Sequence, residues 1–137
     1  MTVRVRAEDG QAAIVLVMAL VVILAVAGLV IDGGAVVTGK IGLQAEADAA
    51  ARRGSEAVDA AAFEATGAGV LDPAAAEDAA RSYVATTCPT CSVSVVATAG
   101  GVTVSLHRPQ PTWFLRPLGV GSVTVAASSS ASPLCRP

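Results

Sequence analysis

Aromatic side chains and basic residues are both scarce in this chain of 137 residues. Phe, Trp and Tyr make up 3% of it, so a soluble core would have to be built from Val, Leu and Ala. Nine basic residues stand against 11 acidic ones, a balance without the cationic excess that follows a phosphate backbone. The sequence therefore predicts no nucleic-acid partner. Its length allows one domain, alone or with a membrane segment, and excludes a multi-domain enzyme.

Histidine is limited to His107, and no cysteine or carboxylate stands at ligand spacing around it. A catalytic nucleophile needs an adjacent base and a third group that orients the base, and the sequence has no such combination. No glycine-rich loop of phosphate-binding form joins a strand to a helix. Most carboxylates lie in alanine-rich stretches beside basic residues, as on a solvated helix face. These absences predict a non-enzymatic protein with no cofactor, no metal site and no small-molecule substrate.

Hydrophobic residues are concentrated in one uncharged run at 12–31. A helix of that length spans roughly 30 Å, the thickness of a bilayer's hydrocarbon core. The run therefore predicts a transmembrane helix, with membrane lipid as a partner. Arg4 and Arg6 precede it and the first cation after it is Lys40, so the positive-inside rule makes residues 1–11 a cytoplasmic leader. The rest of the chain is then extracytoplasmic, in a single-pass membrane protein.

A cleaved secretory signal is the alternative to this anchor. Ala25 and Ala27 before Gly28 satisfy the small-residue preference of a cleavage site. The hydrophobic stretch continues through residues 29–31, past the possible cut, and only an anchor uses all of it. We therefore expect that Gly28 is not the first residue of the mature protein.

Residues 32–66 are rich in alanine and lack proline, which predicts an extracytoplasmic helix continuous with the membrane span as far as residue 64. Gly33-Gly34 is the expected kink. Small residues recur here at spacings of three and four, and such a stripe lets another backbone approach closely. The stripe consists of Ala35, Gly39, Gly42, Ala45 and Ala49. An alanine-rich composition would scatter small residues in the same way, so helix packing and composition both explain the pattern.

Residues 67–137 predict a small helix followed by a β-sheet and a mobile C-terminal tail. Gly67 suits a left-handed helix cap, and Asp72 before Pro73 predicts a second helix that starts there and ends near residue 86.

Alternating apolar and polar residues at 92–108 predict a β-hairpin with Gly100-Gly101 as its loop and Ala99 paired with Val102. A third strand is expected at 122–128. The fold class is α+β, with a long N-terminal helix, a second short helix and a small antiparallel sheet of about three strands.

Cys88 and Cys91 form a CxxC motif, and the third cysteine is Cys135. In an oxidising compartment a structural disulfide is the expected state. A bridge from Cys135 to Cys88 or Cys91 closes a long loop and restricts the unfolded chain more than a local one does. We therefore predict the long bridge, with a local Cys88–Cys91 bridge as the alternative. A zinc site would need Cys135 and His107 as further ligands, and catalytic redox chemistry would place the CxxC before a helix, not after one.

Several stretches together carry a family resemblance. In chain order they comprise a glycine before the apolar run, an Asp-Gly-Gly after it, a Leu-Gln-Ala-Glu-Ala-Asp stretch, and a Trp-Phe-Leu segment followed by a Val-rich strand. The residues that carry it are Gly10, Asp32, Gly33, Leu43, Gln44, Asp48 and 112–125. Their order and spacing resemble those of TadE/TadG-like Flp pilus-assembly proteins.

The resemblance implies a membrane-anchored, minor pilin-like or assembly component of a Flp/Tad-type pilus or secretion system in a bacterial cell membrane. The α+β fold expected above agrees with it, because that outline is also pilin-like. Its N-terminal helix would contact other pilus-assembly or pilin-like proteins. Processed pseudopilins of this type carry a glutamate five residues after the glycine, where this chain has Val15, so we expect no cut after Gly10. Two further hypotheses are an anchored or secreted binding module unrelated to pili, with the loop around Trp113 as its contact surface, and a redox protein that uses the CxxC motif.

Overall fold

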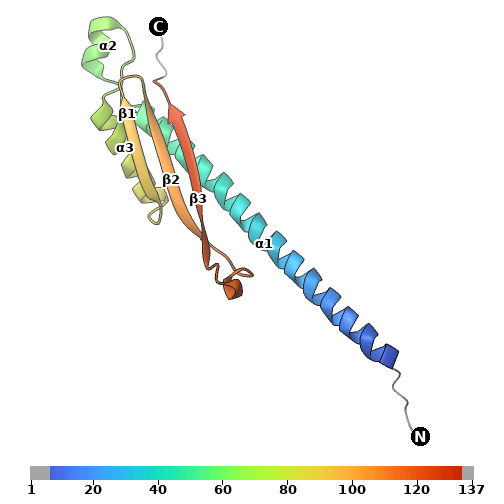
Figure 1. The fold of residues 1–137 in the computed structure, drawn as a ribbon. Coiled ribbons are helices and arrows are strands. Elements are labelled where there is room, and N and C mark those ends of the chain that lie inside the picture. The colour runs from blue at the N-terminus through green and yellow to red at the C-terminus, as the bar shows by residue number, and fades with distance from the viewer. Residues whose placement is uncertain (1–6, 134–137) are drawn as a thin grey trace.

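The computed structural model describes residues 7–133 and is dominated by one long helix with a small sheet along its second half (Figure 1). Helix α1 spans Ala7–Ser55 and contains no proline. It stays helical and straight through Gly33 and Gly34, so the expected kink there is wrong. Glycine costs only about 1 kcal/mol relative to alanine in a helix interior, which is too little at two positions to interrupt a helix of 49 residues.

The prediction that the helix continues to residue 64 is also wrong, because α1 ends at Ser55. Val58 then forms a β-bridge with Leu71, and the Asp59 N–H donates to the Val70 carbonyl at 2.8 Å. Leu71 is buried, so leaving the helix at this point lets the chain close over the end of the domain.

Two short helices follow, and each begins at an aspartate cap. Helix α2 spans Ala60–Thr66 and α3 spans Pro73–Thr87. Asp72 accepts hydrogen bonds from the first free N–H groups of α3, as predicted, and Asp59 does the same for α2. Gly67 ends α2 at a φ of 69°, which confirms the predicted left-handed cap.

The sheet has three antiparallel strands in the order β1-β2-β3. They span Ser92–Thr98, Gly101–Pro111 and Ser122–Ala131. The hairpin register differs from the prediction by two residues, because Ala97 lies opposite Val102 and the turn falls at Ala99-Gly100. A shift of two leaves every side chain on its original face, so alternation alone does not distinguish the two registers. The third strand also extends to Ala131, so the tail predicted to be mobile is ordered strand as far as that residue.

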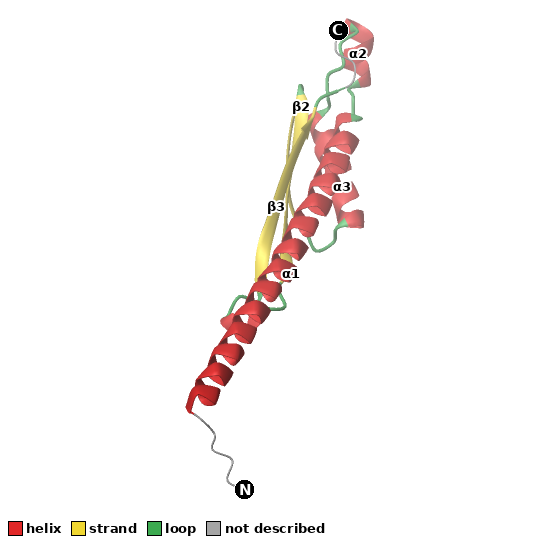
Figure 2. Cartoon of the chain, turned by 90° about the vertical axis from the view of Figure 1, so that its right-hand side faces the viewer, coloured by secondary structure: helices red, strands yellow, loops and turns green. Residues whose placement is uncertain are grey.

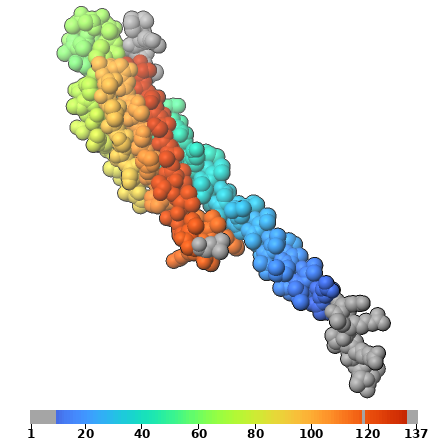
Figure 3. Space-filling view, viewed as in Figure 1, coloured from blue at the N-terminus to red at the C-terminus, as the bar shows by residue number. Residues whose placement is uncertain are grey.

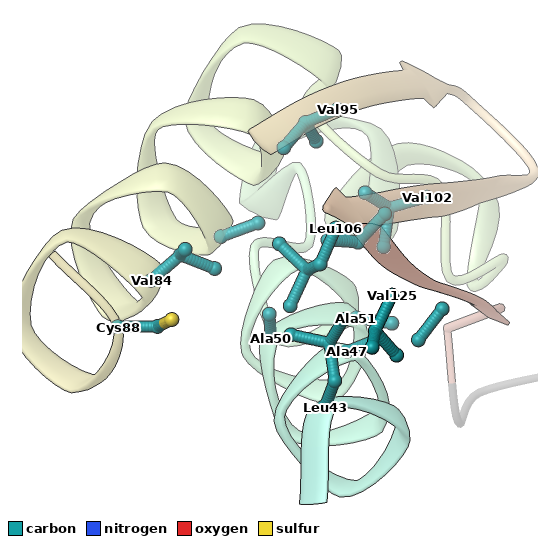
Figure 4. Close-up of a cluster of buried hydrophobic side chains, with 13 residues drawn as sticks. Leu43, Ala47, Ala50, Ala51, Val84, Cys88, Val95, Val102, Leu106 and Val125 are labelled. Atoms are coloured by element: carbon teal, nitrogen blue, oxygen red, sulfur yellow. The ribbon is translucent and has the colours of Figure 1, made fainter. Parts of the chain in front are cut away.

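One face of the sheet packs against α1 and α3 to form a two-layer domain (Figure 2). The core consists of small and medium side chains, as the shortage of aromatics requires. From α1 it takes Leu43, Ala47, Ala50 and Ala51, from α3 Ala80, Val84 and Cys88, and from the strands Val95, Val102, Val104, Leu106, Val125 and Ala127 (Figure 4). Alanine on the helices allows the helix and sheet backbones to approach closely.

Gly54 and Gly42 allow a matched test of this close packing. A Cβ on Gly54 would lie 3.0 Å from the Ala76 carbonyl oxygen and 3.0 Å from Val102 Cγ1, whereas a Cβ on Gly42 meets nothing within 4 Å. We expect Gly54→Ala to lower the free energy of unfolding by about 1–3 kcal/mol through overpacking. Gly42→Ala should raise it by up to about 1 kcal/mol through helix propensity. Urea unfolding of the two variants measures both, and equal effects would contradict the packing described here.

Candidate functional site

The first half of α1 projects beyond the domain (Figure 3), and its residues 12–31 are apolar and uncharged. It is long and apolar enough to cross a membrane. Its large apolar side chains are between 56% and 72% exposed. They are Ile14, Val15, Leu16, Val17, Met18, Leu20, Val21, Val22, Ile23, Leu24, Val26, Leu29, Val30 and Ile31. An exposed apolar surface of this extent indicates a lipid or protein contact.

Asp32 follows this segment directly and fastens the loop between β2 and β3 to α1. Its side chain is buried, and both carboxylate oxygens are used. The Trp113 N–H donates to Oδ1 at 3.0 Å, and the N–H groups of Phe114 and Leu115 each donate to Oδ2 at 2.9 Å. Three donors converging on one carboxylate fix both the position and the orientation of the loop.

Glycine at position 28 allows the same loop to lie against the helix. A Cβ on Gly28 would lie 2.8 Å from Phe114 Cγ, so any larger residue would displace the aromatic ring. The loop closes on itself where Thr112 Oγ1 donates to the Val120 carbonyl and the Thr112 N–H donates to the Gly121 carbonyl at 3.2 Å. The loop and helix therefore meet at the end of the apolar segment.

The negative charge of Asp32 strengthens the contact between the loop and α1 at neutral pH. Burial of the Asp32 carboxyl acts to raise its pKa, but the N–H donors of Trp113, Leu115 and Phe114 together outweigh burial. The pKa of Asp32 is therefore lower than its ordinary value of 3.8. A carboxyl whose pKa is lowered by folding stabilises the folded state above its ordinary pKa and loses that contribution as the pH falls through the lowered value.

We therefore expect Asp32→Asn to loosen the loop, because the amide replaces an acceptor oxygen with a donor. Hydrogen exchange at Trp113, Phe114 and Leu115 should accelerate by at least about tenfold at neutral pH. In the unmodified protein, loop protection should fall as the pH drops below about 4. Asp78→Asn, at an exposed position of α3, is the matched control and should leave exchange in the loop unchanged. Unaltered protection in Asp32→Asn would show that the carboxylate does not hold the loop.

The other motif residues join α1 to the sheet or remain exposed. Leu43 is buried in the core, and Gln44 Nε2 donates to Asp48 Oδ1 at 3.1 Å and to the Ser128 carbonyl at 3.0 Å. Hydrogen bonds from Ser129 and Gln44 lower the pKa of Asp48. Gly10 and Gly33 are exposed, and a Cβ on either would meet nothing within 4 Å.

The small-residue stripe lies beside the face of α1 that packs on the sheet. Ala35, Gly42 and Ala45 are exposed, and Ala49 is half-buried. Gly39 contacts the strands, because its carbonyl accepts from Arg108 Nη2 at 3.3 Å and its Cβ position is 2.9 Å from Gln110 Oε1. Close approach of a second backbone along this stripe stays a prediction.

The disulfide joins Cys88 to Cys91, with the two Cα atoms 5.4 Å apart, so the predicted bridge to Cys135 is wrong. The local chain conformation explains the pairing. Cys88 ends α3 by donating its N–H to the Val84 carbonyl at 2.8 Å, and the Cys91 N–H returns to the Cys88 carbonyl at 3.0 Å. This tight turn holds the two sulfurs close together without the closure of a longer loop. Cys135 lies outside the described residues.

Glu46 is a neighbour of this disulfide that sequence spacing did not suggest. Its carboxylate and the two sulfurs lie within 4.8 Å of one another, and Oε2 is buried without a hydrogen-bond partner among the residues of 7–133. Thiolates bind metals, whereas sulfurs joined in a disulfide lack the required charge. His107 lies away from this group, exposed on the sheet between Ser92 and Ala126.

Fold and site together define an α+β protein, in which one helix carries an exposed apolar segment and then a small sheet domain. Residues 32–131 match the model of the Tad-like Flp pilus-assembly family, and the chain belongs to that family. The match begins at Asp32 and includes the loop that Asp32 holds, whereas Gly10 precedes it. Comparisons with curated proteins and with solved structures gave no match.

Proposed function

We propose that this protein is a membrane-anchored, minor pilin-like or assembly component of a Flp/Tad-type pilus or secretion system, with no enzymatic activity. The observation that carries the proposal is the division of α1 at Asp32. Before it the helix presents exposed aliphatic side chains, and after it the same helix forms the core of the domain. Membership of the pilus-assembly family supports the same role.

The proposed anchor crosses the membrane once, with residues 1–11 in the cytoplasm and the domain outside. Arg4 and Arg6 support this orientation through the positive-inside rule. The Cys88–Cys91 disulfide also supports it, because disulfides persist in oxidising compartments. Continuous helix across Ala27 and Gly28 favours an anchor over a cleaved signal, since a cut there would divide one rigid helix.

In this role the apolar segment would contact lipid and the helices of other pilus-assembly or pilin-like proteins. The stripe from Ala35 to Ala49 would contact such helices outside the membrane. Apolar helices in lipid associate through close packing at small residues, not through the hydrophobic effect. The domain would then be the part that pilus components meet outside the membrane.

Deletion of this protein from its bacterium tests the proposal. We expect loss of surface Flp pili in electron micrographs, and restoration by the unmodified chain. A chain with arginine at both Leu20 and Leu24 should not restore them, whereas one with Asp78→Asn should. Normal pili in the deletion strain would contradict the proposed role.

A further inference from the structure

We propose that the loop at 112–121 is a second membrane contact, in which Trp113 and Phe114 lie in the headgroup region of the leaflet from which α1 emerges. This inference rests on the proposed membrane anchor and extends it. It assigns the loop a lipid partner, where the sequence alone suggested the contact surface of a binding module with no stated partner.

The position of the loop along α1 is the first observation. Phe114 packs on Gly28, which lies three residues before the end of the apolar segment 12–31. At 1.5 Å per residue, this contact is about 5 Å inside the end of the segment. Asp32 holds the adjoining backbone of the loop one residue beyond that end. When the apolar segment is in the bilayer, the loop is therefore at the depth of the interface.

The exposed side chains of the loop are those that the interface favours. Trp113 is 81% exposed and Phe114 is 53% exposed, although the whole chain has only four aromatic residues. Tryptophan is enriched at membrane–water interfaces because its ring is apolar while its N–H donates to the headgroup region. Arg116 is exposed on the same loop and can meet lipid phosphates.

Six backbone N–H groups of the loop donate to acceptors within the protein, as a medium poor in water requires. Irregular backbone is tolerated near the hydrocarbon only when its polar groups have partners. Asp32 accepts three of the loop's N–H groups, and carbonyls within the loop accept three more. The donors are Trp113, Phe114 and Leu115 to Asp32, Thr112 to Gly121, Gly119 to Arg116 and Val120 to Leu115. Entry into the interface would leave none of these six N–H groups without a partner.

Trp113 is the single tryptophan of the chain, so its fluorescence reports the position of the loop directly. The full chain is reconstituted into vesicles of phosphatidylcholine and phosphatidylglycerol and washed with carbonate. We expect blue-shifted emission, quenching by lipids labelled near the headgroup, and acrylamide quenching at least about threefold weaker than for an aqueous tryptophan.

Two variants provide the references. Trp113→Phe combined with Val96→Trp moves the tryptophan to a position on β1 that is 61% exposed, and it should be quenched freely by acrylamide. Asp32→Ala should release the loop and increase acrylamide quenching of Trp113, while Asp78→Ala should not.

The outcomes separate the two proposals. Protein that stays in the vesicles while Trp113 is quenched by acrylamide as freely as the tryptophan at position 96 would overturn the lipid contact and leave the anchor intact. The same result would favour a protein partner for the loop. Protein that carbonate removes from the vesicles would overturn both the lipid contact and the anchor.

Discussion

Arginine at both Leu20 and Leu24 is expected to release the protein from carbonate-washed membranes. The two side chains are 56% and 60% exposed, one turn apart on the apolar segment, so neither substitution disturbs the domain. Each arginine near the centre of a membrane helix costs about 2.5–3.5 kcal/mol of insertion free energy. Two together should convert stable insertion into partial or complete loss, measured as the fraction of protein in the supernatant.

The control uses the same helix beyond Asp32. Val37 and Ile41 are 59% and 67% exposed and also one turn apart, but they lie beside the sheet domain. Arginine at both should leave the protein in the membrane pellet. Equal release by the two double variants would show that the segment before Asp32 has no special role in anchoring.

Leu106→Ala should cause the largest loss of domain stability. Leu106 is fully buried on β2, the central strand, between Val93 on β1 and Ala127 on β3. Four of the seven helix side chains in this core are alanine, and short side chains cannot move in to fill the space. We expect the free energy of unfolding to fall by about 2–5 kcal/mol, the range for leucine truncation in a tightly packed core.

Pulse proteolysis of the full chain in detergent, over a urea series, measures this loss. Val96→Ala on β1 removes an aliphatic side chain that is 61% exposed, and it should change stability by less than about 0.5 kcal/mol. A loss below about 1 kcal/mol for Leu106→Ala would contradict a core centred on this residue.

The sequence predicts the elements of the fold better than their ends. Composition and alternation predict the long helix and all three strands, because these signals are repeated over many residues. The helix ends at Ser55 because Val58 pairs with Leu71, a contact between residues on opposite sides of α2 that no local pattern contains. The hairpin register was wrong by two residues because both registers bury the same face of β2.

The contact at Asp32 was missed for a similar reason. Family resemblance singled out Asp32 and the stretch containing Trp113 separately, and nothing in either motif states that they meet across 81 residues. A signal was present, because an aspartate directly after an apolar run needs donors if it is buried. The cysteine prediction weighed the entropy of the unfolded chain and overlooked the tight turn that ends α3.

Labelling of single cysteines from outside the cell tests the central claim, that α1 crosses the membrane and leaves the domain outside. With Cys135 replaced by serine, Val96→Cys should react with a membrane-impermeant maleimide in intact spheroplasts. Thr2→Cys should react only after the membrane is permeabilised. Labelling of Thr2→Cys in intact spheroplasts, or of Val96→Cys only after permeabilisation, would contradict the account.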